Sequence, residues 1–333
     1  MKQIDLAIIG GGAAGMAAAL SANSQGIKNI CIFERNAQLG GVLRQCIHNG
    51  FGLHRFAADL TGTEYAKRCV DDLVNAKIPF LTNTMVLELS DDLVVTAVNT
   101  EGLVQFQAKA IILAMGCRER SRGSLLIPGA RPAGVLTAGT AQRYMNLEGY
   151  RVGQDIVILG SGDIGLIMAR QFTLEGAAVH AVVEIMSYST GLTHNLVQCL
   201  DNFSIPVFYN TTVVNIEGKE RLSSVTVAEV DNQRRPIAGT EKKIVCDTLI
   251  ISVGLIPENE LTLAMGIPLS EASGGAIVDD SLQTRKKGIF ACGNVLHIHD
   301  LVDSVSMEGD QAGLAAAQYI NSHYAKRVKQ DTC

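Results

Sequence analysis

The chain has 333 residues, of which 47% are hydrophobic and 18% are charged, and its net charge at pH 7 is −5. This length allows about two domains of ordinary size, each with its own core. Because the chain is slightly acidic and has no long run of Lys and Arg, the composition argues against a nucleic-acid partner.

The cysteines and the first apolar stretch bear on cellular location. Eight cysteines are scattered without any C-x-x-C spacing, which argues against a disulfide framework or a zinc site and suits a reducing cytoplasm. The uncharged stretch LAIIGGGAAGMAAALSA, from Leu6 to Ala22, superficially resembles a signal peptide or a membrane span. Asp5 at its entrance and its clustered glycines favour a strand, a turn and a helix instead. We therefore expect a cytoplasmic protein without a membrane segment.

A glycine motif follows the first predicted strand. The segment DLAIIGGGAAGMAAAL contains Gly10-x-Gly12-x-x-Gly15 and continues into an Ala-rich helix. In such motifs the glycines permit a tight turn, the approach of a pyrophosphate to the helix N-terminus and close helix–strand packing. The next predicted strand, NICIFER, contains Glu34, whose carboxylate can bind the hydroxyls of an adenosine ribose. This pattern predicts a dinucleotide site.

The same pattern recurs later in the chain. The segment DIVILGSGDIGLIMAR contains Gly160-x-Gly162-x-x-Gly165, and the following strand, AVHAVVE, ends in Glu184. Each of these residues lies 150 positions after its counterpart in the first motif. Two such sites predict two different dinucleotides, and we expect a bound flavin and a nicotinamide that exchanges hydride with it. The carboxylate of Glu184 favours a free ribose 2′-hydroxyl, so NAD(H) is expected to be preferred over NADP(H).

Further segments resemble the two-domain flavin and pyridine-nucleotide oxidoreductases of the thioredoxin-reductase-like kind. They are AIILAMG (110–116), TLIISVGLIPEN (248–259) and GAIVDDSLQTRKKGIFACGN (275–294). The resemblance implies an α/β fold with two Rossmann-like three-layer dinucleotide-binding domains. An FAD-binding domain of residues 1–117 and 252–333 would hold an inserted NAD(H)-binding domain of residues 118–251.

The motifs and this resemblance together predict the cofactor contacts. Asn294 stands where an Asp usually bonds the ribityl chain, and its amide can still bond a hydroxyl. The helix that begins near Ser304 should direct its N-terminus at the flavin pyrimidine. The predicted FAD contacts are Gly10, Gly12, Ala14, Gly15, Glu34, Arg35, Gly41, Val42, Arg44, Ala114, Gly116, Gly293, Asn294, Ser304 and Val305. The predicted NAD contacts are Gly160, Gly162, Asp163, Ile164, Gly165, Glu184 and Gly254.

The redox disulfide of this family is absent at both of its usual places. Where thioredoxin reductases carry C-x-x-C, this chain reads RPAGVLTAGTAQRY, with Thr137 and Thr140 in place of sulfur. Where the glutathione-reductase type carries two cysteines, this chain has only Cys46. Disulfide reductase activity is therefore not expected.

Three interpretations of Cys46 stay open. It could be a catalytic thiol, as in single-cysteine NADH peroxidases and oxidases, activated by His48 or Arg44. It could also be a redox-inactive residue beside the flavin, or a packing residue.

A narrower resemblance points to a coupling component. GVLTAGTAQ resembles FAD subunits of opine oxidases and hydrogen cyanide synthase. LRQCIHNGFG and ACGNVLHIHDLVD resemble a bacterial group that accompanies a glycerol-3-phosphate or 2-hydroxy-acid dehydrogenase subunit and a small cysteine-rich protein. The implied function is hydride transfer between NADH and bound FAD, with electrons passed to a partner subunit or small acceptor. A homo- or hetero-oligomer is compatible with this role.

Two other functions remain as alternatives. One is a single-cysteine NADH peroxidase or oxidase that uses Cys46, and the other is a structural subunit that binds nucleotide without turnover.

Histidines and acids crowd into the segment HIHDLVD, at His297, His299, Asp300 and Asp303. The segment directly follows the predicted flavin contacts, which favours a loop over the isoalloxazine edge. We therefore expect no metal site there.

Overall fold

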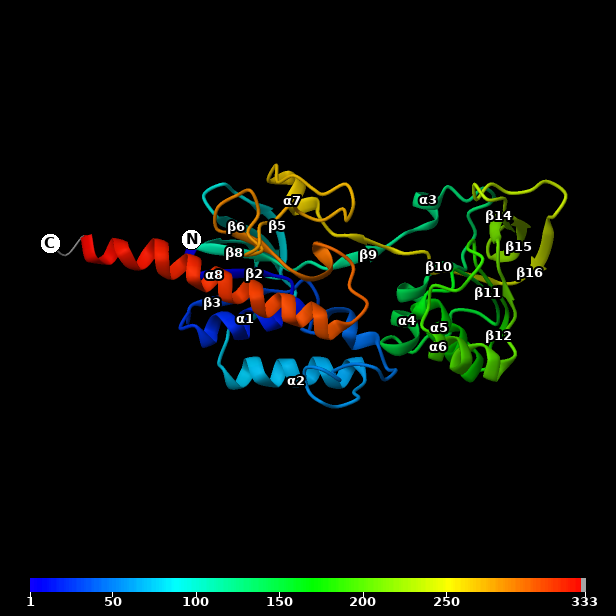
Figure 1. The fold of residues 1–333 in the computed structure, drawn as a ribbon, viewed down its shortest axis with the longest axis horizontal. Helices are drawn as coiled ribbons and strands as arrows, with labels where there is room; N and C mark the ends of the chain where they lie inside the picture. The colour runs from blue at the N-terminus through cyan, green and yellow to red at the C-terminus, as the bar shows by residue number, and fades with distance from the viewer. Residues whose placement is uncertain (331–333) are drawn as a thin grey trace. The chain divides into compact units, whose positions relative to one another are not determined.

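The computed structural model describes residues 1–330 of the chain and the side chains as far as Tyr324. It divides into two compact units, one formed by residues 1–118 with the segment from Ile256 onward, and the other by residues 119–255. Each unit has a five-stranded parallel sheet and a separate antiparallel or mixed sheet (Figure 1). The predicted α/β class, with one Rossmann-like three-layer unit inserted into another, is confirmed.

The first unit is built on a parallel sheet. Its strands are β2 (Leu6–Ile9), β3 (Ile30–Phe33), β4 (Phe80–Leu81), β8 (Ala110–Leu113) and β19 (Ile289–Ala291). They are ordered β19-β8-β2-β3-β4, and every neighbouring pair is parallel. Each of the strands β2, β3 and β8 has four residues, and all of them are buried, as expected for central strands covered on both faces.

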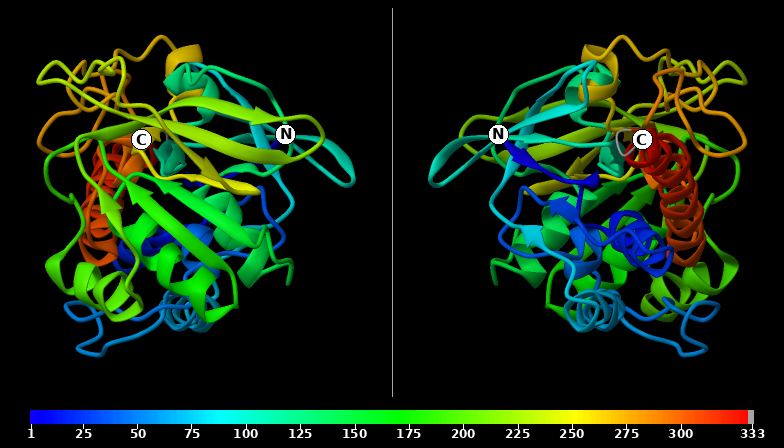
Figure 2. Two further views of the ribbon diagram at one scale, coloured as in Figure 1. Left: turned by 90° about the vertical axis from the view of Figure 1, so that its right-hand side faces the viewer. Right: turned by 90° about the vertical axis from the view of Figure 1, so that its left-hand side faces the viewer.

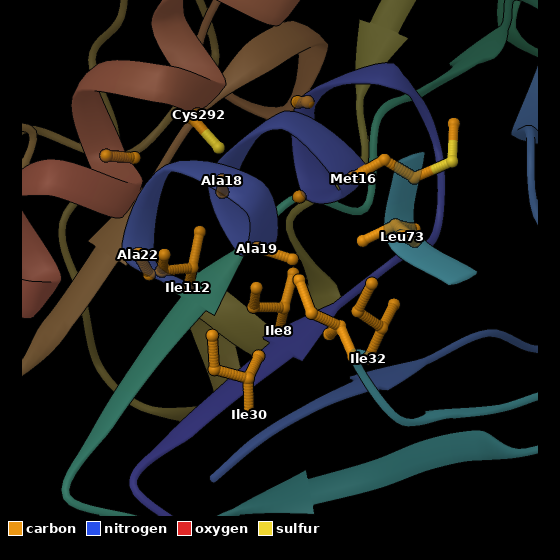
Figure 3. Packing of buried hydrophobic residues seen from close by; sticks show 14 of the residues in the cluster. Ile8, Met16, Ala18, Ala19, Ala22, Ile30, Ile32, Leu73, Ile112 and Cys292 are labelled. Carbon is orange, nitrogen blue, oxygen red and sulfur yellow. The ribbon is translucent and has the colours of Figure 1, made fainter. Parts of the chain in front are cut away.

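Three helices cover one face of this sheet. They are α1 (Ala13–Ser24), α2 (Gly62–Asn75) and α8 (Val302–Gln330). Alternate strand residues point to opposite faces, and Ile8, Ile32 and Ile112 belong to the same buried cluster as the alanines of α1. Figure 3 shows Ile8 and Ile112 beneath Ala19 and Ala22 of α1. Small helix residues thus bring α1 close to the sheet, while α8 lies beside α1 (Figure 2, right).

The other face of the sheet packs on a meander. Its strands are β1 (Lys2–Gln3), β5 (Met85–Leu89), β6 (Val94–Asn99) and β7 (Gly102–Gln107), in the order β1-β7-β6-β5. Ala7, Ile9 and Phe33, the alternate residues of β2 and β3, share a second core with this meander. The short elements η1 (Gly41–Gln45), α7 (Glu260–Ala264) and η3 (Gly293–Val295) complete the unit.

The start of α2 follows directly from its sequence. Thr61 accepts a hydrogen bond at Oγ1 from the Glu64 N–H at 3.3 Å, and Glu64 Oε2 accepts one from the Thr61 N–H at 2.8 Å. This reciprocal capping box pairs two backbone donors at the helix end. It fixes the end of the loop that follows Cys46.

The second unit repeats the plan. Its parallel sheet, ordered β10-β17-β11-β12-β13, contains β10 (Val135–Thr137), β11 (Asp155–Leu159), β12 (Ala178–Val183), β13 (Val207–Phe208) and β17 (Thr248–Ile251). An antiparallel sheet contains β14 (Thr211–Gly218), β15 (Leu222–Glu229) and β16 (Lys242–Val245). The helical elements are α3 (Arg122–Leu125), α4 (Ala138–Asn146), α5 (Asp163–Leu174), α6 (Thr193–Cys199) and η2 (Asp201–Phe203). Figure 2 (left) shows the antiparallel strands on one side of the parallel sheet and helices on the other.

The chain passes between the units through two short strands. They are β9 (Cys117–Glu119) and β18 (Leu255–Pro257), which pair with each other. Among the described residues, no helix combines the length and the apolar character needed to cross a bilayer.

Candidate functional site

The first glycine motif lies where β2 turns into α1. Gly10 has a φ of +109°, and a Cβ on Gly15 would lie 1.9 Å from the Gly10 carbonyl oxygen, so both positions require glycine for the fold itself. Gly12 differs, because a Cβ there would meet no protein atom within 4 Å. No side chain caps α1 at this end. An open space in front of an uncapped helix N-terminus is the cradle that a dinucleotide phosphate needs.

The carboxylate of Glu34 is held against this turn. Glu34 is buried, and its Oε2 accepts a hydrogen bond from the Gly11 N–H at 3.0 Å. Its Oε1 accepts hydrogen bonds from the Asn36 backbone N–H at 2.7 Å and from Asn36 Nδ2 at 2.9 Å. These three N–H donors hold the buried carboxylate in place at the end of β3.

The second glycine motif has the same construction between β11 and α5. Gly160 has a φ of +103°, and a Cβ on Gly165 would lie 2.5 Å from the Gly160 carbonyl oxygen. Glu184 is buried, and its Oε2 accepts hydrogen bonds from the Ser161 N–H at 2.9 Å and from Ser161 Oγ at 2.6 Å. Its Oε1 accepts a hydrogen bond from the Met186 N–H at 2.9 Å. The 150-residue repeat therefore extends from the sequence to the hydrogen bonds.

A loop that follows β12 is hydrogen-bonded to the second motif. Asp163, in the first turn of α5, accepts hydrogen bonds at Oδ1 from the Leu192 N–H at 2.8 Å and from Asn195 Nδ2 at 2.7 Å. Gly191 N–H and Ser189 Oγ both donate to the Ser161 carbonyl oxygen. Asp163 is a predicted NAD contact, and its carboxylate joins this loop to the motif. Ile164 beside it is partly buried, and Gly254 accepts a hydrogen bond at its carbonyl oxygen from the Arg120 N–H at 3.1 Å.

The structure brings many of the predicted FAD residues together at the carboxyl ends of β2 and β8. A Cβ on Gly10 would lie 2.3 Å from the Ala114 carbonyl oxygen, and one on Gly293 would lie 2.8 Å from Ala14 Cβ. The predicted FAD residues in which a Cβ placed on a glycine would come close to another residue of the group are Gly10, Gly12, Ala14, Gly15, Gly41, Ala114, Gly293 and Val305.

The remaining predicted FAD residues lie at the margin of this set. Gly116 has a φ of +73° and open space around its Cα. Arg35 and Val42 are exposed, and Arg44 and Ser304 are partly buried. Asn294 is occupied within the protein, because its Oδ1 accepts the His299 N–H at 3.1 Å and its Nδ2 donates to Cys117 Sγ at 3.6 Å.

An acid that the sequence analysis did not assign to the flavin lies beside Ser304. Asp303 is 5% exposed, and its Oδ2 accepts a hydrogen bond from the His54 N–H at 3.0 Å. Its Oδ1 is buried and has no hydrogen-bond partner among the described residues. A buried carboxylate oxygen without a donor is costly. It therefore fits a ligand group that donates a hydrogen bond, and the chain fits a bound cofactor here as well as at Gly12.

Cys46 does not have the surroundings of an activated thiol. It is 8% exposed, and its Sγ lies 3.4 Å from the Val42 carbonyl oxygen. Burial raises the pKa of the Cys46 thiol to about 12. A reactive cysteine needs a lowered pKa and access to solvent. Desolvation by this burial acts against the activation by His48 or Arg44 that the catalytic interpretation requires.

Thr137 and Thr140 lie at the N-terminus of α4. Thr137 Oγ1 donates a hydrogen bond to Thr140 Oγ1 at 2.8 Å. The Gly139 N–H in the same turn donates to Glu119 Oε1 at 2.8 Å. The seven cysteines within the described residues are all outside disulfides, and Cys333 lies beyond that part of the chain.

The predicted loop after Asn294 brings two histidines against an acid that the sequence analysis missed. His299 Nε2 lies 3.3 Å from Glu308 Oε2, and His297 Nδ1 lies 3.8 Å from Glu308 Oε1. Glu308 follows the two histidines by about ten positions, on the next helix. The only signal in the sequence for Glu308 was an acid in the first turns of the helix after the loop. This signal is weak, because the sequence does not show which side of the helix faces the loop.

Comparison with known proteins agrees with this construction. The hydrogen cyanide synthase subunit HcnB of Pseudomonas protegens is 26% identical in an alignment that is 340 positions long and covers 93% of this chain and 68% of that protein. A thioredoxin reductase of Treponema pallidum is 25% identical over 325 residues, which cover 96% of this chain and 97% of that protein. The crystal structure of T. acidophilum thioredoxin reductase shares the fold, with a TM-score of 0.78 at 23% identity over 96% of this chain and 99% of that chain.

The family is settled by a match over nearly the whole chain. The sequence profile described as "Pyridine nucleotide-disulphide oxidoreductase" matches residues 4–326. Both glycine motifs and both buried glutamates lie inside this range. The resemblance noted from the sequence is confirmed, and the chain belongs to the FAD- and NAD(P)-dependent pyridine nucleotide-disulphide oxidoreductase family.

Proposed function

We propose that this enzyme transfers hydride between NADH and bound FAD and passes electrons to a partner subunit or small acceptor, without acting as a disulfide reductase. The first motif, with Glu34, would hold FAD, and the second, with Glu184, would hold NAD(H). Bound FAD would supply the redox chemistry, because a flavin can take up a hydride from a reduced nicotinamide and give the two electrons to an acceptor. The protein residues bind and orient the two dinucleotides.

The observation that carries this proposal is the pair Thr137 and Thr140. Two hydroxyls, 2.8 Å apart, stand at the sequence position where thioredoxin reductases carry their two sulfurs. Neither hydroxyl can take part in thiol–disulfide exchange, which requires a thiolate. The two threonines therefore support an acceptor other than a disulfide reduced through these residues.

The surroundings of Cys46 argue against the peroxidase alternative. A thiol that cycles through sulfenic acid needs thiolate character and access for the peroxide. Cys46 is buried, with its pKa raised to about 12 by that burial. The chemistry is therefore expected to proceed without a protein thiol.

The preference for NADH rests on Glu184 and the segment that follows it. A buried carboxylate held by Ser161 and Met186 binds ribose hydroxyls and repels a 2′-phosphate. The next residues, Ile185 to Gly191, contain no Lys or Arg that could neutralise a phosphate. NADPH is therefore expected to react more slowly at equal concentration.

The proposal of a partner is supported by HcnB of Pseudomonas protegens, which is a subunit of hydrogen cyanide synthase. The narrower resemblance of LRQCIHNGFG and ACGNVLHIHDLVD suggests the partners: a dehydrogenase subunit and a cysteine-rich protein would exchange electrons with the flavin of this chain in the cytoplasm. A homo- or hetero-oligomer would follow.

The experiment that tests the function is an anaerobic titration of the FAD-loaded protein with NADH and, separately, with NADPH, followed by its visible spectrum. We expect rapid bleaching of the oxidised flavin band by NADH and slower bleaching by NADPH. An FAD-loaded protein that NADH cannot reduce would favour the structural subunit. NADH-dependent reduction of added peroxide or oxygen that is lost in Cys46→Ser would favour the single-thiol enzyme, and reduction of an added disulfide substrate would overturn the proposal.

A further inference from the structure

Three metal-binding side chains converge beside the segment Gly293–Asn294. Two imidazoles come from the His-x-His loop, at His297 and His299, and one carboxylate comes from Glu308 on α8. One donor atom from each residue can be chosen so that all three lie within 4.8 Å of one another. The two imidazole rings lie 4.1 Å apart between centroids, at an angle of 44°.

These separations are close to those in a coordination sphere. Zinc bonds to nitrogen and oxygen of about 2.0–2.2 Å in a tetrahedron place neighbouring donor atoms about 3.3–3.6 Å apart. His299 Nε2 lies 3.3 Å from Glu308 Oε2, and His297 Nδ1 lies 3.8 Å from the other carboxylate oxygen, Oε1. The second distance is too long for a hydrogen bond, but a small rotation of the exposed His297 ring would bring it within coordinating range.

Contacts within the protein hold His299 and Glu308 in place. The next residue on α8, Gly309, packs so closely on α1 that a Cβ there would lie 2.3 Å from the Ala14 carbonyl oxygen. Glu308 also accepts a hydrogen bond from the Gly293 N–H. The His299 N–H is held by Asn294 Oδ1 at 3.1 Å. Such surrounding contacts orient ligands before an ion binds.

We propose that His297, His299 and Glu308 bind one divalent first-row transition metal ion, such as Zn²⁺, with at least one coordination position open to water or a substrate oxygen. Two imidazoles and a carboxylate suit Zn²⁺, Co²⁺ or Fe²⁺ better than Ca²⁺ or Mg²⁺, which prefer oxygen ligands. Three protein ligands leave a vacant position, as in catalytic zinc sites. The side chain of His297 is 51% exposed, whereas those of His299 and Glu308 are 12% exposed, so the open position would face solvent. This proposal revises the expectation, drawn from the sequence, that no metal binds here.

The site does not depend on the proposed function, and its test does not use activity. The full-length, tag-free protein loaded with FAD is stripped with a chelator, and Zn²⁺ binding is then followed by titration calorimetry and by metal analysis after dialysis. We expect one tightly held Zn²⁺ per chain. Loss of a single ligand in His297→Ala or His299→Ala should weaken binding at least about tenfold.

Two variants separate a site from general histidine binding. His323→Ala removes an exposed histidine of α8 outside the cluster, and it should bind Zn²⁺ like the unaltered chain. Glu308→Gln also disturbs the bond to Gly293, so its FAD content is measured alongside its Zn²⁺ content. The proposal is overturned if the unaltered protein retains no Zn²⁺ after dialysis. It is equally overturned if His297→Ala and His299→Ala, each with full FAD content, bind Zn²⁺ as tightly as His323→Ala.

Discussion

Glu34 and Glu184 are related by more than their 150-residue spacing, because their buried carboxylates accept equivalent hydrogen bonds. Each receives the backbone N–H of the residue that follows the first glycine of its motif, at 3.0 Å from Gly11 and at 2.9 Å from Ser161. Each also receives the backbone N–H of the residue two positions further along its own strand end. Both acids are therefore fixed by the fold before a ribose arrives.

Replacing each acid by alanine should weaken the binding of one cofactor and leave the binding of the other unchanged. Glu34→Ala is expected to weaken FAD binding about tenfold to a hundredfold, since a hydrogen bond to a charged group contributes about 1.5–3 kcal/mol. Glu184→Ala should retain FAD and raise the KM for NADH by a similar factor. Bound flavin is read from the visible spectrum, and KM from the rate of flavin reduction.

Glu175→Ala is the matched control, because Glu175 is an exposed acid at the end of α5, outside both cradles. If Glu184→Ala lost FAD while Glu34→Ala kept it, the assignment of the two motifs would have to be exchanged.

The second glycine of each motif should be dispensable for folding and required for binding. Gly12 and Gly162 both have negative φ, and a Cβ at either would meet no protein atom closer than 3.7 Å. Gly12→Ala should fold with unchanged stability, within about 0.5 kcal/mol, and lose FAD. Gly162→Ala should keep FAD and lose affinity for NADH. Stability is measured by denaturant unfolding of the apoprotein.

Gly15→Ala gives the contrasting result, because its Cβ would lie 1.9 Å from the Gly10 carbonyl oxygen. This variant should be destabilised even without cofactor. Full flavin content in Gly12→Ala would show that the phosphate does not approach the backbone at that residue.

The thiol of Cys46 should be unreactive toward alkylating reagents in the folded protein. Because its thiol is buried and its pKa is raised to about 12, iodoacetamide at pH 8 should label Cys46 only after unfolding. Cys46→Ala should keep NADH-dependent flavin reduction within about twofold, since no step requires this sulfur. Peptide mass mapping measures the labelling. Labelling of native Cys46 at the rate of a free thiol would contradict this interpretation.

Buried thiols should also make the fold sensitive to alkali. Desolvation raises the pKa of Cys31 and Cys69 to about 12, as for Cys46. A raised native pKa means that the unfolded chain loses these protons first. The thiols therefore stabilise the fold fully below about pH 9, and this contribution falls between about pH 9 and pH 12, by up to about 1.4 kcal/mol per pH unit and thiol.

Urea unfolding at several pH values measures how the free energy of unfolding falls as the pH rises. Cys69→Ala should make this fall less steep by about the contribution of one thiol. An unchanged slope would mean that these groups do not govern alkaline stability.

The sequence predicts the repeated units well, because glycine spacing and buried strands are local signals. The turn at Gly10, the acid at Glu34 and the recurrence at Gly160 and Glu184 all lie where the pattern places them. The role of Asp163 could not be read in this way, since its partners Leu192 and Asn195 lie a loop away. Glu308 and the unpaired oxygen of Asp303 likewise depend on how α8 packs, which no local pattern encodes.

The hydrogen bond from the Gly139 N–H to Glu119 would disfavour reactive cysteines at the N-terminus of α4. A helix N-terminus lowers the pKa of a nearby thiol, and a carboxylate at the same place opposes that effect. Cysteines introduced at positions 137 and 140 would therefore meet a neutralised helix end, and their thiolates would gain little from it. A third substitution, at Glu119, would therefore favour dithiol chemistry at these two positions.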